Sequence, residues 1–127
     1  MACSREAANG AFDSTRFPIS TTVTGVILDL EPGALRELHW HPNADEWQYV
    51  IEGDVNVTMF GSHGRFRTEL LHTGDAGFIP QGYGHSIENL GSQQSRILIG
   101  FNTGIYESID LFLLDSRQSG GRSRDKF

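Results

Sequence analysis

Hydrophobic and polar residues alternate over short runs along most of the chain, and glycine or proline separates the runs. Alternation with a period of two is typical of β-strands that bury one face. The predicted strands are 21–30, 35–41, 46–52, 55–59, 65–71, a short strand that ends at residue 80, 85–89 and 95–101. With 15 glycines and 4 prolines among 127 residues, this pattern favours a single all-β domain, a sandwich or a barrel.

The two ends of the chain lack this pattern. Residues 1–16 are polar and predict a flexible N-terminal arm, the domain itself is expected over 17–116, and the polar, basic residues 117–127 predict a disordered tail. In the run 105–114, apolar side chains at i, i+4, i+7 and i+8 predict a short C-terminal helix. No internal repeat and no second domain are visible.

The strand 46–52 places polar and aromatic side chains on opposite faces. Glu46 shares one face with polar neighbours, whereas Trp47, Tyr49 and Ile51 lie on the other, and Trp40 of the preceding strand is assigned to this aromatic face as well. An uncovered aromatic face is costly in water, so we expect a second subunit to cover it, in a homodimer or a higher homo-oligomer. The alternative is that the N-terminal segment folds across this face.

Charge and composition limit the classes of partner. The formal charge of −6 argues against nucleic acid or an anionic membrane as a partner, and a bound small anion would need a local cation. The chain has one cysteine, Cys3, so no intramolecular disulfide is expected. No run is apolar enough for a membrane span or a signal peptide, which predicts a cytoplasmic protein, although a trimmed secreted protein would look the same.

Candidate chemistry begins at the end of the strand 35–41. His39 and His41 stand two residues apart, so both side chains leave the same face of a strand. A turn over 42–45 follows, and Glu46 begins the next strand. Such a hairpin brings two imidazoles and a carboxylate together, as a metal site requires. Taken alone, a polar strand face with solvated histidines explains the same pattern.

The rest of the chain decides between these interpretations, because two glycine-bounded blocks stand in order. The block 33–53 reads G-x5-H-x-H-x4-E-x6-G, and the block 74–89 reads G-x5-P-x-G-x2-H-x3-N, with His85 as its histidine. These blocks resemble the two cupin motifs. RELHWHPNADEWQYVIEG and GFIPQGYGHSIEN are similar to the metal-binding domains of bicupin oxalate decarboxylases, the C-terminal domain especially, over about residues 20–114.

The resemblance implies a cupin double-stranded β-helix, a jelly-roll barrel, with a metal held by His39, His41, Glu46 and His85. Such a ligand set leaves two octahedral positions open, which suits Mn2+, the family's usual metal, or Fe2+; Ni2+ and Zn2+ are further alternatives. The implied substrate is oxalate or a similar small carboxylate. Arg36 matches the arginine that holds the substrate's other carboxylate, but strict alternation places it opposite His39, so this role requires a bulge between them.

The chain also departs from the decarboxylase pattern. The Ser-Glu-Asn-Ser-Thr lid run, which supplies a proton-donating glutamate, is absent, and Ile99 occupies the position of a glutamate in the C-terminal domain. Glu107 is the nearest acid and is a candidate proton donor, or otherwise a solvated carboxylate; Tyr106 matches a family aromatic. Three hypotheses stay open. The first is an oxalate-degrading manganese enzyme, either a decarboxylase (a lyase) or an oxidase (an oxidoreductase). The second is a metal-dependent cupin acting on another small acid or a sugar, and the third is a non-catalytic metal- or ligand-binding cupin.

Overall fold

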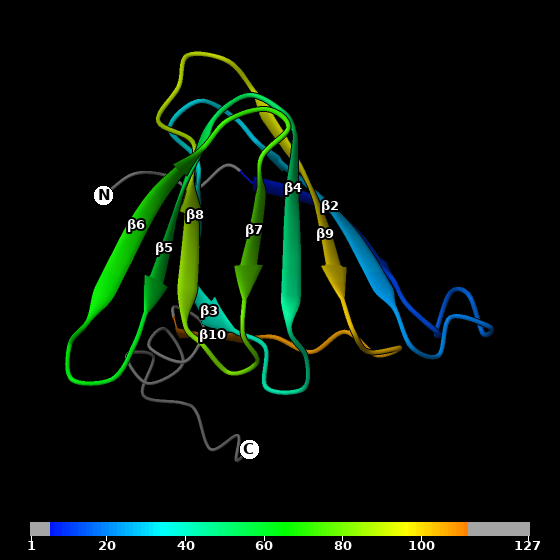
Figure 1. The fold of residues 1–127 in the computed structure, drawn as a ribbon. Helices are drawn as coiled ribbons and strands as arrows, with labels where there is room; N and C mark the ends of the chain where they lie inside the picture. The colour runs from blue at the N-terminus through cyan, green and yellow to red at the C-terminus, as the bar shows by residue number, and fades with distance from the viewer. Residues whose placement is uncertain (1–5, 112–127) are drawn as a thin grey trace, which may run out of the picture.

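The computed structural model describes residues 6–111, with side chains from residue 10 onward, and contains two antiparallel five-stranded sheets (Figure 1). One sheet has the strand order β1-β2-β9-β4-β7 and the other has the order β10-β3-β8-β5-β6. The strands are β1 (Glu6–Phe12), β2 (Thr24–Leu30), β3 (Leu35–Trp40), β4 (Glu46–Glu52), β5 (Val55–Phe60), β6 (Phe66–Leu71), β7 (Ala76–Ile79), β8 (His85–Glu88), β9 (Ser95–Phe101) and β10 (Ile109–Asp110). The prediction of an all-β barrel is confirmed.

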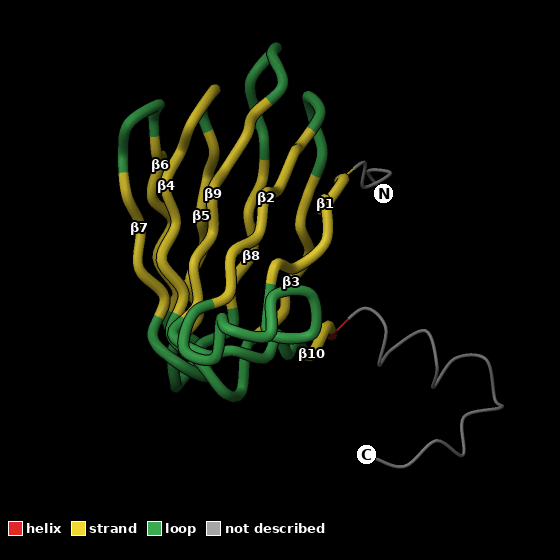
Figure 2. Tube along the Cα trace, turned by 90° about the vertical axis from the view of Figure 1, so that its right-hand side faces the viewer, coloured by secondary structure: helices red, strands yellow, loops and turns green. Residues whose placement is uncertain are grey.

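The core lies between the two sheets, which stand as two layers in Figure 2. In β2 and β9 every second side chain is buried, as the period of two predicts. The buried apolar side chains are Val26, Leu28, Leu30, Ala34, Ala44, Val50, Val55, Val57, Ile79, Ile87, Ile97, Ile99 and Phe101. This core fixes the positions of the strands that carry the polar motif residues.

The predicted helix over 105–114 is wrong for residues 105–110. Here the chain forms a loop and then β10, in which Ile109 lies opposite Trp40 of β3 and Asp110 lies opposite His39. The backbone N–H and C=O groups along the outer edge of β3 need partners, and β10 supplies them, whereas a helix this short is marginal by itself. Residues 112–114, together with the predicted tail over 117–127, lie outside the described residues.

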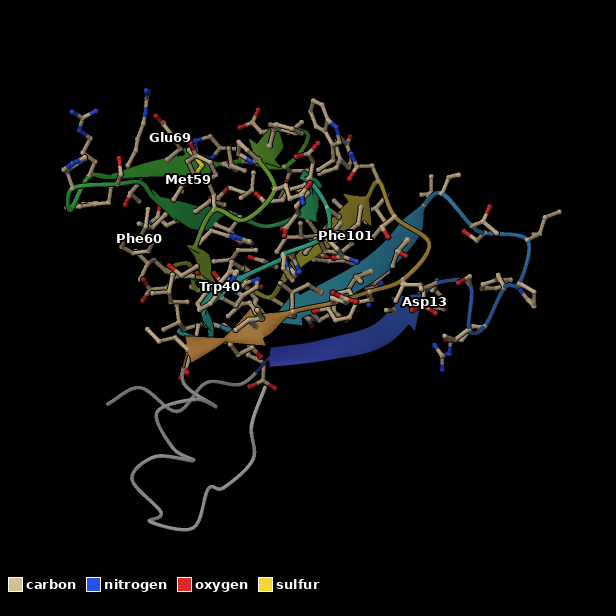
Figure 3. The ribbon with its side chains drawn as sticks, turned by 90° about the horizontal axis from the view of Figure 1, so that it is seen from below. Asp13, Trp40, Met59, Phe60, Glu69 and Phe101 are labelled. Atoms are coloured by element: carbon tan, nitrogen blue, oxygen red, sulfur yellow. The ribbon has the colours of Figure 1, made fainter. Side chains whose placement is uncertain are left out.

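The predicted N-terminal arm contains a strand. Residues 6–12 form β1, which pairs antiparallel with β2 at the edge of the first sheet. Asp13, labelled in Figure 3, is buried just after this strand, and its carboxylate accepts a hydrogen bond from the backbone N–H of Tyr106 at 3.2 Å. The backbone N–H of Ser14 donates to the carbonyl oxygen of Gly104 at 2.8 Å. The N-terminal segment therefore supports the loop that precedes β10.

The outer face of the first sheet is apolar and exposed. Trp47 and Tyr49 of β4 are 60% and 48% exposed, and Phe78 of β7 packs against Trp47 with ring centroids 5.0 Å apart. Leu98 of β9 continues this face. Trp40, expected on the same face, belongs to β3 in the other sheet. Since β1 extends the sheet edge beside β2, the described part of the N-terminal segment does not cross the face over β4.

Within residues 6–111, no helix is long and apolar enough to cross a membrane.

Candidate metal centre

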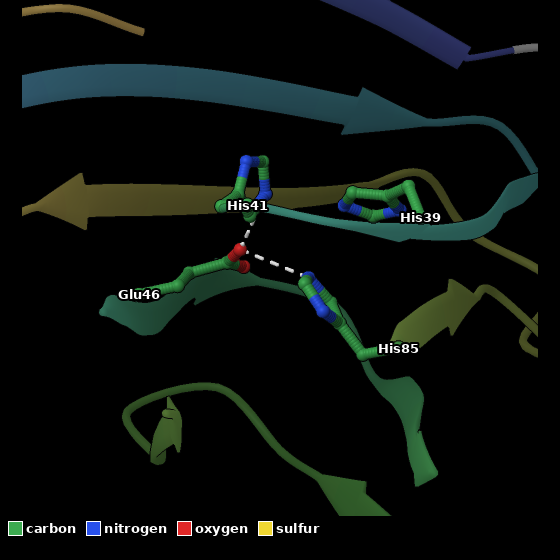
Figure 4. Close-up of side chains that lie close together, drawn as sticks. All are labelled: His39, His41, Glu46 and His85. Carbon is green, nitrogen blue, oxygen red and sulfur yellow. Dashed lines mark ion pairs between the residues drawn. The ribbon is translucent and has the colours of Figure 1, made fainter. Parts of the chain in front are cut away.

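Three histidines and one glutamate meet at the end of the barrel where β3 ends and β4 and β8 begin, which is the lower end in Figure 1. His39 lies in β3 directly opposite His85, the first residue of β8. His41 follows β3, and Glu46 begins β4 in the facing sheet. Each of the four side chains offers one ligand atom, and these atoms lie within 4.8 Å of one another (Figure 4). All four are at least 96% buried, so the structure brings together the four residues singled out in the sequence.

The turn between β3 and β4 is tied to the loop between β7 and β8. The N–H of Gly82 donates to the carbonyl oxygen of His41 at 2.9 Å. The carboxylate of Asp45 accepts from the N–H of Gln81 at 2.8 Å and from the amide of Asn102 at 3.0 Å. These hydrogen bonds join segments that are about 40 to 60 residues apart in sequence. The two motifs are therefore held in one fixed geometry.

Each imidazole of the cluster is oriented by a backbone carbonyl. A carbonyl oxygen can only accept, so the Nδ1 atom that contacts it carries the ring proton. The acceptors are Glu37 for His39 (2.6 Å), Glu107 for His41 (2.7 Å) and Tyr83 for His85 (3.1 Å). In the neutral ring this leaves the lone pair on Nε2, which is the arrangement that metal-ligating histidines adopt.

The charges of the cluster also suit a cation. Burial alone would raise the pKa of Glu46, but the imidazoles of His41 and His85, whose Nε2 atoms both lie 2.9 Å from Oε2, outweigh it and hold this pKa well below its usual value. Burial, with the nearby charges of His85 and Arg36, lowers the pKa of His39 to about 3. At neutral pH the cluster thus combines an ionised carboxylate with a neutral imidazole at His39.

The donor atoms fit a divalent metal. Oε2 of Glu46 and Nε2 of His85 are fully buried and lie 2.9 Å apart, yet neither atom has a hydrogen-bond partner among the described residues. A divalent cation would satisfy both atoms and could bind all four ligand atoms of the cluster. Gln48, also buried, donates from Nε2 to Oε1 of Glu46 at 2.8 Å, which turns Oε2 toward the histidines.

A bulge in β3 places Arg36 beside the cluster. Arg36 pairs with Ile87 and His39 pairs with His85, so three steps along β3 match two steps along β8. The extra residue brings Arg36 and His39 to the same face, as the sequence-based role of Arg36 required. Both line a small cavity of about 30 Å³ that also includes His41 and Glu46.

The other walls of this cavity are mainly apolar. They consist of Val26, Leu28, Ile87, Ile99, Phe101 and Tyr106. Ile99 is buried and faces the site, so an aliphatic side chain stands where the resemblance places a glutamate. Phe101, near the centre of Figure 3, packs edge-on against the ring of His41 with centroids 4.5 Å apart. Among the described lining residues, Glu46 is the one carboxylate.

Glu107 lies at the site through its backbone. Its carbonyl oxygen accepts from Nδ1 of His41, while its side chain is exposed and does not line the cavity. Its role as a proton donor stays a prediction. The remaining described histidines, His63 and His72, are exposed in or next to loops, as expected, and His72 bonds to Asp54 at 2.9 Å.

Sequence reasoning missed two groups around the site. Gln48 shares the face of Glu46 by alternation, which was a usable signal for its position near the ligands. Asp110 and Ser108 both contact the guanidinium of Arg36, at 3.1 Å and 3.3 Å. They escaped notice because a helix was expected over this segment, and nothing local to it indicates pairing with β3.

Comparison with known proteins agrees with this geometry. The family model described as Cupin matches residues 7–117. The oxalate decarboxylase OxdC of Bacillus subtilis is 43% identical over 99 residues, which cover 78% of this chain and 26% of OxdC. An oxalate decarboxylase of Arthroderma benhamiae is 45% identical over 87 residues, covering 68% of this chain and 20% of that protein.

Solved structures of oxalate decarboxylases are similar to this chain as well. The formate complex of Lactobacillus farciminis oxalate decarboxylase superposes with a TM-score of 0.82 at 34% identity, over 96% of this chain and 37% of that one. The chain spans about a fifth to a quarter of the length of the curated relatives described above. On the match over residues 7–117 and the barrel that carries both motifs, the chain belongs to the cupin family.

Proposed function

We propose that this cupin is a metal-dependent enzyme that acts on oxalate or a similar small carboxylate, with oxalate decarboxylase-like chemistry and manganese as its metal. The observation that carries the proposal is the buried cluster of His39, His41, Glu46 and His85, which shares its cavity with Arg36. The similarity to proteins named oxalate decarboxylases supports the choice of substrate. One structural neighbour is described by its Mn(II) centres, which supports the choice of metal.

The residues of this chain would divide the work as follows. The three Nε2 atoms and the Glu46 carboxylate would hold the metal, which when bound supplies a Lewis acid and a redox-active centre. The backbone carbonyls behind the rings favour the neutral tautomer with its lone pair on Nε2 and aim that atom inward. Arg36 would bind the carboxylate of the substrate that points away from the metal, through its guanidinium. Ile99 and Phe101 exclude water, which strengthens these electrostatic contacts.

Proton delivery separates the two possible outcomes. Cleavage of oxalate to formate and carbon dioxide consumes a proton, which a positioned acid supplies. Oxidation by dioxygen instead yields two molecules of carbon dioxide and one of hydrogen peroxide, and its two protons go to the reduced dioxygen rather than to the carbon of the product. Glu107 is the proposed donor, yet its side chain is exposed and the cavity wall carries Ile99 where an acid would be useful. This favours a share of oxidase-type product, and oxalate oxidation is therefore the second candidate function.

The proposal is tested by metal analysis followed by turnover. Purified protein is loaded with Mn2+, its metal content is measured, and it is incubated with oxalate while formate and hydrogen peroxide are both quantified. We expect formate, peroxide or both from the wild type. Neither product from fully loaded protein would refute the catalytic proposal and favour a non-catalytic binding cupin.

His41→Ala should lose both metal and product because it removes a ligand. His63→Ala, in an exposed hairpin loop, is the matched control and should lose neither. A His41→Ala variant that retained its metal would refute the ligand assignment.

We further propose that the chain forms a homodimer or a higher homo-oligomer through the outer face of the first sheet. An apolar groove on this face is lined by Trp47, Tyr49 and Leu98, and Phe78 packs against Trp47 beside it. Each of these four side chains is more than 40% exposed. Trp47→Lys should shift the protein toward the monomer in sedimentation equilibrium, whereas Phe66→Lys, on β6 of the other sheet, should not. A cytoplasmic location, small-carboxylate substrates and the absence of nucleic-acid or membrane partners stay predictions.

A further inference from the structure

The guanidinium of Arg36 contacts a carboxylate that belongs to the protein itself. Nη2 of Arg36 lies 3.1 Å from Oδ1 of Asp110 and 3.3 Å from Oγ of Ser108. Ser108 in turn donates to the same Asp110 oxygen at 2.8 Å. The cation assigned to the substrate is thus already paired with an anion of the chemical type it would recognise.

The fold holds this carboxylate in place from the edge of β3. Asp110 pairs with His39 across β10 and β3, so it stands beside a residue of the proposed metal site and at the edge of the bulge that turns Arg36 inward. The side chains of Arg36 and Asp110 are 14% and 22% exposed. Burial works against ionisation, yet the contacts with Arg36 and Ser108 keep the pKa of Asp110 below its usual value. The pair is therefore an ionised, largely buried ion pair.

We propose that Asp110 is an internal competitor that occupies, on Arg36, the place of the substrate's second carboxylate, and that binding of a dicarboxylate displaces it. This inference rests on the proposed function. A carboxylate tethered beside a cation acts at a local concentration on the order of millimolar or more, so a free monocarboxylate competes poorly with it. When one carboxylate of a dicarboxylate is held at the ligand cluster, its second carboxylate is also tethered near Arg36. It then has a similar local concentration to Asp110 and can displace Asp110 from the guanidinium.

Asp110 thereby becomes a residue that determines specificity. It favours anions with two carboxylates over anions with one, and it keeps Arg36 charge-balanced when no such anion is bound. Displacement requires only that β10, a two-residue strand at the sheet edge, or the Asp110 side chain alone, moves away from Arg36. No covalent step is involved.

The inference is tested by titrating oxalate into manganese-loaded protein by calorimetry, with bound manganese measured before and after each titration. Asp110→Asn removes the competing charge while keeping the side-chain shape, and we expect the Kd for oxalate to fall by about fivefold or more. Asp110→Thr, which suits a β-strand, should act in the same direction and serves if the asparagine variant folds poorly. Glu52→Gln, an exposed acid at the far end of β4 from Glu46, is the matched control and should leave the Kd unchanged.

A double-mutant cycle separates competition from general charge repulsion. In an Arg36→Gln background the competitor has no cation to occupy, so Asp110→Asn should change the Kd by less than about twofold. A fall in Kd that persists there, or weaker oxalate binding by Asp110→Asn with Arg36 present, would overturn the inference. Wild-type protein that binds oxalate without releasing product would count against the proposed catalysis but not against the competitor. Failure of the wild type and both Asp110 variants to bind oxalate would overturn both.

Discussion

Replacing Gln48 by methionine tests whether the outer hydrogen bond to Glu46 prepares the cluster for metal. Gln48 is 1% exposed, and its Nε2 atom donates to Oε1 of Glu46 at 2.8 Å. Its other amide atom, Oε1, is buried without a hydrogen-bond partner among the described residues. Methionine has nearly the same length and no polar group, so the substitution removes both features at once.

The two features act in opposite directions on the stability of the metal-free protein. Loss of a hydrogen bond to a charged group costs about 1.5–3 kcal/mol, and removal of a buried unsatisfied oxygen returns about 1–3 kcal/mol. The net change in unfolding free energy of Gln48→Met should therefore stay within about 2 kcal/mol of zero. Metal binding has no such offset, because Glu46 loses the contact that turns Oε2 toward the histidines. Loss of an outer partner of a metal ligand typically weakens metal affinity about 10- to 100-fold, or about 1.4–2.8 kcal/mol.

The assay is the Kd for Mn2+ measured by competition with a chelator, together with urea unfolding in excess EDTA. Gln94→Met, at an exposed position, is the matched control and should change neither quantity. A Gln48→Met variant that bound manganese within about twofold of the wild type would refute the idea that Gln48 positions Glu46.

Three further outcomes are expected. Because the pKa of His39 is lowered to about 3, the unfolded chain binds more protons than the folded chain between about pH 6.5 and pH 3. The unfolding free energy of the metal-free protein should therefore fall as the pH drops through this range, by up to about 1.4 kcal/mol per pH unit. His39→Gln should flatten this slope in urea titrations. Manganese at a hundredfold excess over its Kd should stabilise the folded state by about 2.7 kcal/mol, and a melting temperature unchanged by EDTA would contradict a folded-state site. Gly53→Ala should lower the unfolding free energy by about 2–4 kcal/mol, because Gly53 has φ +82° and a Cβ there would lie 2.5 Å from Oγ of Ser95. Gly33→Ala is the control, since Gly33 has φ +80° but open space around it, and it should cost only about 1 kcal/mol in the same denaturation assay.

The sequence alone determined most of the strands of this protein and the residues of its proposed metal site. Alternation is a local property, so it located eight of the ten strands found within residues 6–111 to within a few residues. The spacing of two glycine-bounded blocks identified His39, His41, Glu46 and His85. It also set a condition for Arg36, a bulge in β3, which the register of β3 against β8 meets. Each of these conclusions depends on residues that are neighbours in sequence or match a family pattern.

Only the tertiary structure decided what surrounds those four side chains. The carbonyl that orients His41 comes from Glu107, 66 positions away, and the carboxylate on Arg36 comes from Asp110, 74 positions away. The segment that carries both has apolar residues at helical spacing, and it became a loop and a strand because the open edge of β3 offered backbone partners. The exposed side chain of Glu107 likewise follows from how the sheets close, whereas Ile99 in the cavity wall was already expected from the resemblance. Periodicity reports which face a side chain occupies, whereas the chemistry around a buried cation depends on segments that meet only when the barrel forms.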